Sequence, residues 1–270
     1  AVGIACCVLI ALYVANEWSY DELHSKSDRI YRAWVQETTP EGREILNTST
    51  PVPLAGALEQ NIPEVEHATY LYQFNNLVER PGSEQSFSES ILAASPDFFR
   101  IFDFELLQGD PGTVFKTPSS VVLTPSIANR VFGDRNAIQQ TVSIRLGNDF
   151  VDFSVTGIIE EPPSNSSLQY DILIPDSNLD ALISDGPRSS WFNIFGPTYV
   201  LLKEGGDPAA LQTKLQSMMR GILGKETYQR TQFKLGLQPL TDIHLNTAFP
   251  TSLASVRDPV YSYILVAIAL

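Results

Sequence analysis

Apolar residues are concentrated at the two ends of the chain. Residues 1–14 (AVGIACCVLIALYV) and residues 260–270 (VYSYILVAIAL) contain no charged side chain. A helix needs about 20 apolar residues to cross the hydrocarbon core of a bilayer, so both runs are too short as they stand. Because each run stops at the end of the chain rather than at a polar residue, and residue 1 is not Met, we expect both to be pieces of transmembrane helices that continue outside this sequence.

Other interpretations of the two apolar runs stay open. Either run could be a buried helix or strand of a globular core. The first could be a cleaved signal peptide, although it lacks a basic n-region and an A-x-A-like site before Glu17. The stretch that ends at Cys6 distantly resembles a lipoprotein cleavage site, but the apolar run continues for eight residues beyond it.

A segment dense in charge follows the first run. Residues 16–32 (NEWSYDELHSKSDRIYR) carry Trp18, Leu23, Ile30 and Tyr31 among polar side chains. Aromatic residues next to an apolar run are typical of the membrane–water interface. We therefore expect a helix that leaves the bilayer here and passes into a first strand over residues 33–37.

Three helix starts follow from proline placed directly after a capping residue. They are Ser95-Pro96-Asp97, Thr124-Pro125-Ser126 and Asp207-Pro208. The second helix is expected to end at Gly133, a residue suited to a left-handed C-terminal position. The third has apolar residues at spacings of three and four, which indicates one buried face. These are Leu211, Leu215, Met218 and Ile222, and residues 51–61 give a further, weaker helix.

Runs of β-branched and aromatic residues predict strands throughout the chain. Gly147-Asn148-Asp149 is typical of a hairpin turn. Residues 162–167 (PPSNSS) are the clearest break and the best candidate for a domain junction. Because helices and strands are mixed throughout, the predicted class is α+β. The better strands are residues 69–74, 90–94, 120–123, 142–146, 153–159, 170–174 and 198–202.

Composition narrows the function classes. The chain carries 18 Lys+Arg against 31 Asp+Glu, a formal charge of −13. Nucleic-acid binding and flat adsorption to anionic lipid both need basic surface, so this balance argues against them. The two cysteines, Cys6 and Cys7, lie inside the first apolar run. The rest of the chain therefore has neither a disulfide framework nor thiolate metal ligands.

The sequence contains no G-x-G-x-x-G, G-x-x-x-x-G-K-[ST] or G-x-S-x-G motif. His24, His67 and His244 stand far apart, without a second His or Cys at metal-ligand spacing, and each is expected to be a solvated or hydrogen-bonded surface residue. Glu160 and Glu161 would point to opposite faces of a strand, so they should not converge on a substrate. We therefore expect no catalytic, cofactor-binding or metal-ligating residue and no cofactor.

Several internal motifs resemble one family. They are E-W-S-Y-D-E-L-H (residues 17–24), S-D-R-I-Y-R (27–32), S-P-D-F-F-R-I-F-D-F-E-L-L-Q-G-D (95–110), S-S-V-V-L-T-P-S-I-A-N-R-V-F-G-D (119–134) and V-T-G-I-I-E-E-P-P-S-N-S-S-L (155–168). The pattern is similar to the periplasmic core domain of MacB-type, or FtsX-like, ABC transporter permeases of the Bacteroidetes type. The resemblance runs over the whole chain.

The resemblance implies a two-subdomain α+β core between the first and second of four transmembrane helices. Residues 1–15 would end the first of these helices, residues 16–30 would form a stalk, and residues 255–270 would form the second stalk and the start of the next helix. A membrane-proximal, porter-like βαβ-type subdomain would comprise residues 31–85 and 165–250. A mostly β, distal (sabre-like) subdomain would be inserted as residues 86–164.

The resemblance also implies a non-catalytic permease in the bacterial inner membrane, with this domain in the periplasm. It would couple ATP hydrolysis on a separate ABC ATPase subunit, contacted through regions outside this chain, to export or mechanical transmission. Permeases of this family work as homodimers or related heterodimers, some with periplasmic adaptor or outer-membrane partners. Two alternatives are a membrane-anchored sensor or binding module without an ATPase, and an anchored hydrolase. A signalling region after the second apolar run, in place of two further helices, would distinguish a sensor from a permease.

Overall fold

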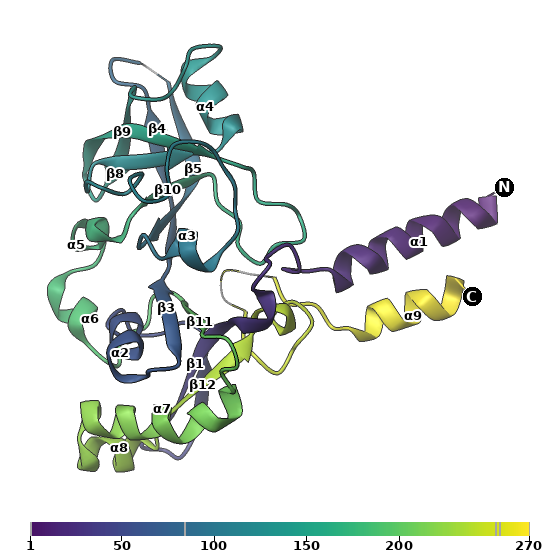
Figure 1. The fold of residues 1–270 in the computed structure, drawn as a ribbon, viewed down its shortest axis with the longest axis vertical. Helices are drawn as coiled ribbons and strands as arrows, with labels where there is room; N and C mark the ends of the chain where they lie inside the picture. Colours follow the sequence, from purple (N-terminus) through teal and green to yellow (C-terminus); the bar gives the residue numbers. More distant parts are fainter. Residues whose placement is uncertain (1, 84, 252, 254, 270) are drawn as a thin grey trace.

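The computed structural model describes every residue except 1, 84, 252, 254 and 270. Residue 1, in the first apolar run, and residue 270, in the second, thus lie outside the described part of the chain. Two sheets form the body of the molecule, and a pair of terminal helices projects from its side (Figure 1). Helices and strands are mixed as the α+β expectation requires, so that expectation is confirmed.

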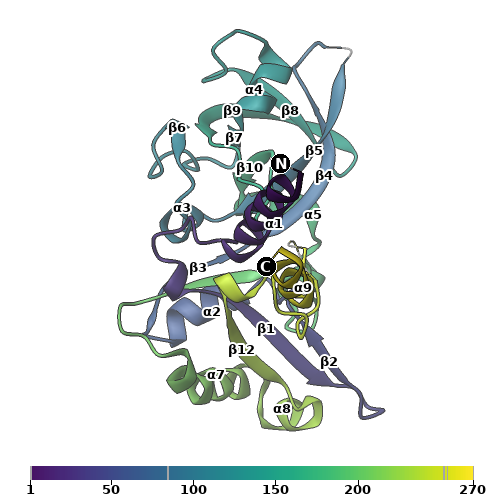
Figure 2. The same cartoon turned by 90° about the vertical axis from the view of Figure 1, so that its right-hand side faces the viewer.

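The first sheet is antiparallel and lies at the lower end of the molecule in Figure 2. Its order is β12-β1-β11-β3, and β2 pairs with the far end of β1. Helix α7 covers the open edge of β12, because the side chains of Gln212 and Gln216 donate to the carbonyl of Leu235 at 3.0 and 2.7 Å. The elements are β1 (Ile30–Thr38), β2 (Glu44–Asn47), α2 (Leu54–Asn61), β3 (Val65–Tyr70), β11 (Thr198–Leu202), α7 (Pro208–Leu223), α8 (Lys225–Thr231) and β12 (Lys234–Pro239).

The second sheet has seven strands in the order β6-β9-β7-β10-β5-β4-β8. An additional pairing of β8 with β9 closes six of them into a ring. Alternate residues face inward and outward, as the period of a strand requires: Ile172 and Ile174 belong to one core cluster and Leu173 to another. The strands are β4 (Tyr72–Glu79), β5 (Ser86–Ala94), β6 (Leu106–Gln108), β7 (Ser120–Leu123), β8 (Thr141–Leu146), β9 (Asp149–Ile159) and β10 (Ile172–Pro175).

The predicted helix starts at Pro125 and Pro208 are confirmed, whereas the start expected at Pro96 lies two residues later, at Phe98. α4 (Pro125–Phe132) ends at Gly133 with φ 64°, and α7 begins at Pro208 after Asp207, whose side chain accepts the Ala209 N–H at 2.9 Å. α3 (Phe98–Ile101) follows the Ser95-Pro96-Asp97 motif but is a single turn. Three further short helices, α5 (Leu179–Leu182), α6 (Asp185–Ser189) and α8, were not anticipated.

The strand predictions are largely confirmed, with one merger. Residues 69–74, expected as one strand, hold the end of β3 and the start of β4, separated at Leu71. β2, β6 and β12 were missed because they are short or interrupted by polar residues and Gly236. The hairpin turn is confirmed, since Leu146 pairs with Asp149 and Gly147 has φ 64°.

The chain changes sheet at different positions from those expected. It crosses from the first sheet to the second at Leu71 and returns after β10, whereas the expected boundaries were residues 85 and 165. The reason is that β4 and β10 both belong to the second sheet. β4 pairs with β5 and β8, and β10 pairs with β5 and β7. The break at residues 162–167 lies between β9 and β10, which belong to the same sheet.

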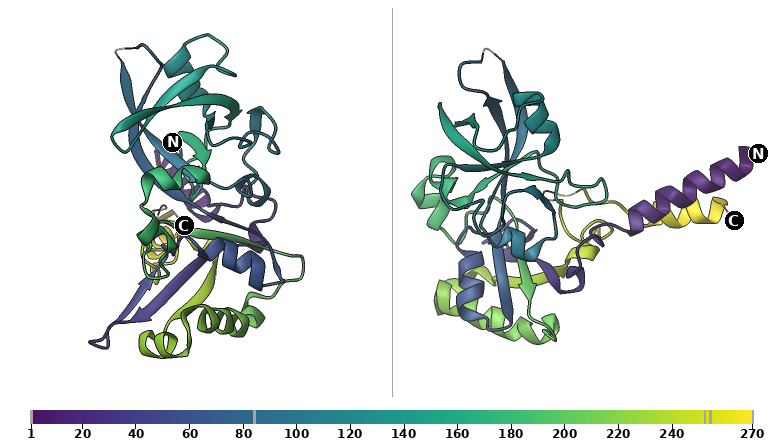
Figure 3. Two further views of the ribbon diagram at one scale, coloured as in Figure 1. Left: turned by 90° about the vertical axis from the view of Figure 1, so that its left-hand side faces the viewer. Right: turned by 45° about the horizontal axis from the view of Figure 1, so that its top comes forward.

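The two apolar runs form α1 (Val2–Trp18) and α9 (Val260–Ala269), which lie side by side and extend together away from the sheets (Figures 1 and 3). Within the described residues, neither helix is long and apolar enough to cross a membrane. The expectation of a helix over residues 16–32 was wrong beyond Trp18. Asp21 there adopts a left-handed φ of 61°, which ends the helical path, and only a short turn, η1 (Ser27–Arg29), precedes β1.

Candidate functional site

The segment between α1 and β1 is where the terminal helices meet both sheets. We call residues 19–29 the junction segment. It enters β1 of the first sheet at Ile30, and its side chains reach loops of the second sheet. Figure 2 shows α1 emerging at the level where the two sheets meet. The contacts of this segment therefore decide how the helices are joined to the rest of the chain.

Asp21 holds the loop between β9 and β10. Its Oδ1 accepts hydrogen bonds from the Ser167 N–H at 2.6 Å and the Ser166 hydroxyl at 3.3 Å, and its own N–H donates to the Asn165 carbonyl at 2.9 Å. The Asn165 amide in turn donates to the Ser19 carbonyl and hydroxyl at 3.2 and 3.0 Å. Asp21 is fully buried, and this burial raises the pKa of its carboxyl group. The loop that seemed a break in the sequence is thus fixed to the base of α1.

A second set of contacts joins the junction segment to the chain after α3. Ser25 donates to Asp103 Oδ2 through its N–H at 2.5 Å and its hydroxyl at 2.6 Å. Lys26 Nζ donates to the Arg100 carbonyl at 2.5 Å and lies 3.6 Å from Asp103 Oδ1. The Asp103 N–H donates to His24 Nδ1 at 3.1 Å. Burial acts to raise the pKa of Asp103, but the Ser25 hydrogen bonds and the Lys26 charge hold it below its usual range.

Aromatic rings pack beneath these polar contacts. The His24 ring lies 5.3 Å from that of Phe102 and 5.0 Å, edge-on, from that of Phe104. Phe102 also contacts Tyr199 of β11 at 5.3 Å, so the cluster reaches the first sheet. Such offset and edge-to-face pairs add to the free energy of simple burial. The buried cluster, which spans both sheets, includes Ile30, Leu92, Phe98, Phe102, Phe104, Val122, Leu168, Tyr170, Leu173, Tyr199 and Leu201.

Glu17, at the end of α1, contacts the connection that leads to α9. Its Oε2 lies 3.0 Å from His244 Nε2 and 3.7 Å from Arg257 Nε. His244 Nδ1 lies 3.0 Å from the Ser255 carbonyl, and the Tyr20 ring stacks on the imidazole at 3.4 Å. Both nitrogens of His244 therefore face oxygen atoms, the Ser255 carbonyl and the Glu17 carboxyl group. His244 is fully buried and Glu17 is 5% exposed, so this contact is shielded from water.

A buried arginine places a positive charge in the same part of the interior as the buried carboxyl group of Asp21. Arg32, on β1, is fully buried and donates from Nη2 to Gln238 Oε1 at 2.6 Å. Within the described residues, its Nε and Nη1 and the Oδ2 of Asp21 have no hydrogen-bond partner. Burial lowers the pKa of Arg32, and the negative charges of Asp21 and Asp242 act against that shift. Arg32 thus supplies positive potential to a region that holds a buried carboxylate.

We predict an acid-sensitive contribution to folding stability from His24. Burial lowers its pKa to about 4, from an ordinary value of 6.5. Between these values the unfolded chain binds more protons than the folded one, so the stabilisation is complete above pH 6.5 and is lost as the pH falls toward 4. The free energy of unfolding should drop by about 2 kcal/mol between pH 7 and pH 5 from this residue.

The measurement is denaturant unfolding of the protein at pH 7 and pH 5, compared with a His24→Asn variant. The asparagine oxygen can accept the Asp103 N–H in place of Nδ1 but does not titrate. We expect the variant to be less stable at pH 7 but to lose less stability on acidification. Equal losses in the two proteins would contradict the assignment.

The structure corrects the expectation that all three histidines lie at the surface. His24 and His244 are buried and hydrogen-bonded, because each fills a gap between the junction and its neighbours, whereas His67 is half-buried. Glu160 and Glu161 do not converge: Glu160 accepts the Glu105 N–H and Glu161 the Ser126 N–H, both at 2.9 Å.

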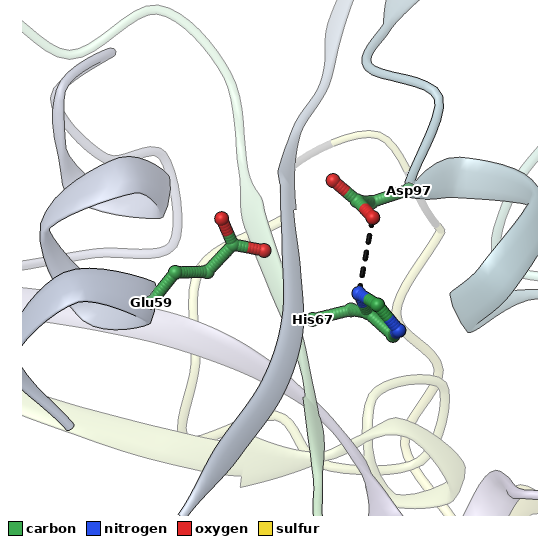
Figure 4. Close-up of side chains that lie close together, drawn as sticks. All are labelled: Glu59, His67 and Asp97. Carbon is green, nitrogen blue, oxygen red and sulfur yellow. Dashed lines mark ion pairs between the residues drawn. The ribbon is translucent and has the colours of Figure 1, made fainter. Parts of the chain in front are cut away.

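One group of side chains has the composition of a metal site. Glu59, His67 and Asp97 each place a ligand atom within 4.8 Å of the others (Figure 4). His67 Nδ1 and Arg100 Nη1 both lie 3.0 Å from Asp97 Oδ1, and Glu59 Oε1 accepts the Ala68 N–H at 2.7 Å. The oxygens are thus already engaged, and the Arg100 charge opposes a cation. We interpret the group as a link between β3 and α3. Its three residues are not spaced in the sequence in any pattern that would have predicted a metal site.

The fold and the junction define a mixed domain of two sheets carried on neighbouring apolar helices. A family model described as the MacB-like periplasmic core domain matches residues 1–218. The chain belongs to this family, which is part of the ABC-type permeases and is typically non-catalytic. No curated protein matches the sequence at a significant level.

Solved structures share this fold. A domain of a protein assigned as a permease in Porphyromonas gingivalis has a TM-score of 0.70 at 21% identity, covering 90% of this chain and 98% of that one. The periplasmic region of MacB from Actinobacillus actinomycetemcomitans has a TM-score of 0.51 at 16% identity, with 76% and 87% covered. The extracellular domain of the ABC-type transporter YknZ from Gram-positive bacteria has a TM-score of 0.51 at 10% identity, with 77% and 99% covered. At these identities the likeness shows the fold.

Proposed function

We propose that this chain is the extracytoplasmic part of an ABC transporter permease and that it transmits the effect of cytoplasmic ATP hydrolysis to the outside of the membrane. The observation that carries the proposal is the junction, where two neighbouring apolar helices meet a domain through buried charged side chains. Buried, hydrogen-bonded contacts resist bending, so a displacement of the helices would move the domain. Periplasmic export or mechanical work on a partner would follow from that movement.

The helix pair supports placement in the membrane. Large apolar side chains on α1 and α9 are exposed, among them Ile4 at 73%, Leu9 at 66% and Ile268 at 69%. Trp18 and Tyr263 lie 6.1 Å apart near the ends that face the domain, where aromatic residues suit the membrane–water interface. We propose that α1 and α9 belong to the first and second of four membrane helices in the inner membrane, with the domain in the periplasm.

The proposed partners are an ABC ATPase, bound through parts of the permease outside this chain, and a second permease subunit, identical or related. Adaptor or outer-membrane proteins would be partners on the periplasmic side. We propose that residues 30–71 with 198–239 serve as the membrane-proximal part and residues 72–175 as the inserted distal part, following the strand pairings.

The test is purification of the full-length permease from its native membranes, followed by reconstitution in lipid nanodiscs. We expect an ABC ATPase to co-purify and its rate of ATP hydrolysis to depend on the permease, while the permease alone hydrolyses no ATP. If no ATPase co-purifies with the protein, and the full-length protein has a signalling region after α9, the result would support a membrane-anchored sensor instead.

A further inference from the structure

A cleft lies between α1 and α9 at the ends of the helices that face the domain. Tyr13 and Glu17 of α1 and Tyr261 and Ser262 of α9 line it, and residues 256–258 of the connection before α9 complete its lining. Its volume is about 220 Å³. The aromatic pair that we place at the membrane–water interface is formed by the residues that follow Glu17 and Ser262. The cleft is therefore at the depth of lipid headgroups.

The cleft carries both signs of charge. Arg257 donates from Nη1 to the Tyr13 hydroxyl at 2.9 Å, and its Nε lies 3.7 Å from Glu17 Oε2. Among the residues that the structure describes, its Nη2 has no hydrogen-bond partner. Asp258 is exposed and accepts the Val260 N–H through Oδ1 at 2.9 Å, which leaves Oδ2 without a donor from the described part of the chain. A guanidinium and a carboxylate with unused hydrogen-bonding capacity thus line the same cleft.

These groups match a headgroup that carries a phosphate and a primary ammonium. A guanidinium binds phosphate oxygens through parallel N–H bonds, and a carboxylate accepts the N–H groups of an ammonium ion. The Tyr13 hydroxyl accepts from Arg257, so its own hydrogen stays available for a phosphate oxygen. Phosphatidylethanolamine has both groups. Phosphatidylglycerol has no cation for Asp258, and the ammonium of phosphatidylcholine has no N–H to donate.

Apolar side chains continue from the cleft along both helices. Leu9 lies four residues before Tyr13 on α1, and Ile264 and Ile268 lie three and seven residues after Tyr261 on α9. Residues at these spacings share one face of a helix. All of them are exposed, so the acyl chains of a lipid whose headgroup occupied the cleft would find apolar contacts along both helices.

From the paired charges and the position of the cleft, we infer that it binds the headgroup of phosphatidylethanolamine from the leaflet on the side of the domain. Arg257 holds the phosphate, and Asp258 holds the ammonium, with the Glu17 carboxyl group beside them. The inference rests on the proposed placement of α1 and α9 in the membrane and names a ligand for that placement. A bound headgroup contacts both α1 and the segment before α9.

The test uses the full-length permease with its ATPase, purified in detergent and mixed with a defined lipid. Native mass spectrometry measures the apparent affinity for the dioleoyl forms of phosphatidylethanolamine, phosphatidylcholine and phosphatidylglycerol. Arg257→Gln removes the guanidinium. Asp258→Asn removes the carboxylate charge but keeps an oxygen that can accept the Val260 N–H, so the start of α9 is preserved. Arg220→Gln, which replaces an exposed arginine on α7 away from the terminal helices, is the matched control.

We expect the parent to bind phosphatidylethanolamine about tenfold more tightly than either other lipid, because charge-assisted hydrogen bonds distinguish the headgroups. Arg257→Gln should lower the affinity for phosphatidylethanolamine about tenfold, and Asp258→Asn should remove most of the preference over phosphatidylcholine. The control should leave both unaltered. Glycerophosphoethanolamine, the same headgroup without acyl chains, should not displace the lipid at equal concentration, because it lacks the apolar contacts.

Equal affinity of the parent for the three lipids would overturn the inference, as would an unchanged affinity for phosphatidylethanolamine in both variants. Displacement by glycerophosphoethanolamine at equal concentration would indicate a soluble ligand and overturn it as well. Each of these results leaves the proposed function standing where ATP hydrolysis still depends on the permease. Hydrolysis that is independent of the permease would remove the proposed function but not the lipid site.

Discussion

Replacing Gly196 by alanine should destabilise the domain by about 3 kcal/mol or more and lower its melting temperature by about 10 °C. Gly196 is buried where the chain returns from the second sheet to the first, and its carbonyl accepts the Thr50 N–H at 2.8 Å. A Cβ at this position would overlap the Leu71 carbonyl oxygen, which belongs to the other crossing. Because the obstacle is backbone rather than a flexible side chain, the chain segments at Gly196 and Leu71 would have to move apart.

The matched control is Gly221→Ala. Gly221 is exposed within α7, and a Cβ there would meet open space. Alanine should therefore stabilise the helix by about 0.5–1 kcal/mol. Thermal unfolding followed by circular dichroism separates the two changes. A melting temperature of Gly196→Ala within 2 °C of the parent, a threshold of roughly 0.5–1 kcal/mol for a chain of this size, would show that the crossings are not tightly packed.

The local elements of this fold could be predicted because they depend on neighbouring residues. The Pro125 and Pro208 helix starts, the Gly147 turn and strands such as Ser120–Leu123 carry their own signals. The crossings could not be located in this way. β3 and β4 are separated only by Leu71, so the change of sheet leaves no polar break, whereas the conspicuous PPSNSS loop connects two strands of one sheet.

The junction shows a similar limit. The polar segment after α1 was expected to continue as a helix into the first strand and, by the family resemblance, to form a stalk. Asp21 and His24 are instead buried, since their partners Ser167 and Asp103 are distant in sequence and only the fold brings them together. A mixed polar and aromatic segment next to an apolar helix was the available signal. It indicated the location without revealing the contacts.

Removing Glu17 should be among the most disruptive changes at the junction. In Glu17→Ala the Nε2 of the buried His244 loses its hydrogen-bond partner, and leaving a buried polar group without its partner typically destabilises by about 1–3 kcal/mol, and by more where the group is charged. Arg257 is 55% exposed on its side chain and can turn to solvent, so it should not add to the loss. Glu17→Gln retains an oxygen acceptor for Nε2–H and should be less harmful than alanine.

A double-mutant cycle measures the contact itself. His244→Ala also loses the stacking on Tyr20 and the contact with the Ser255 carbonyl, so its effect alone overstates the pair. Once either partner is absent, removing the other should matter less, giving a coupling free energy of about 1–3 kcal/mol between Glu17 and His244. Ser19→Ala with His244→Ala is the comparison pair, since Ser19 bonds to Asn165 instead, and should be close to additive. Additivity of the Glu17 and His244 changes would mean that this contact does not join the ends of α1 and α9.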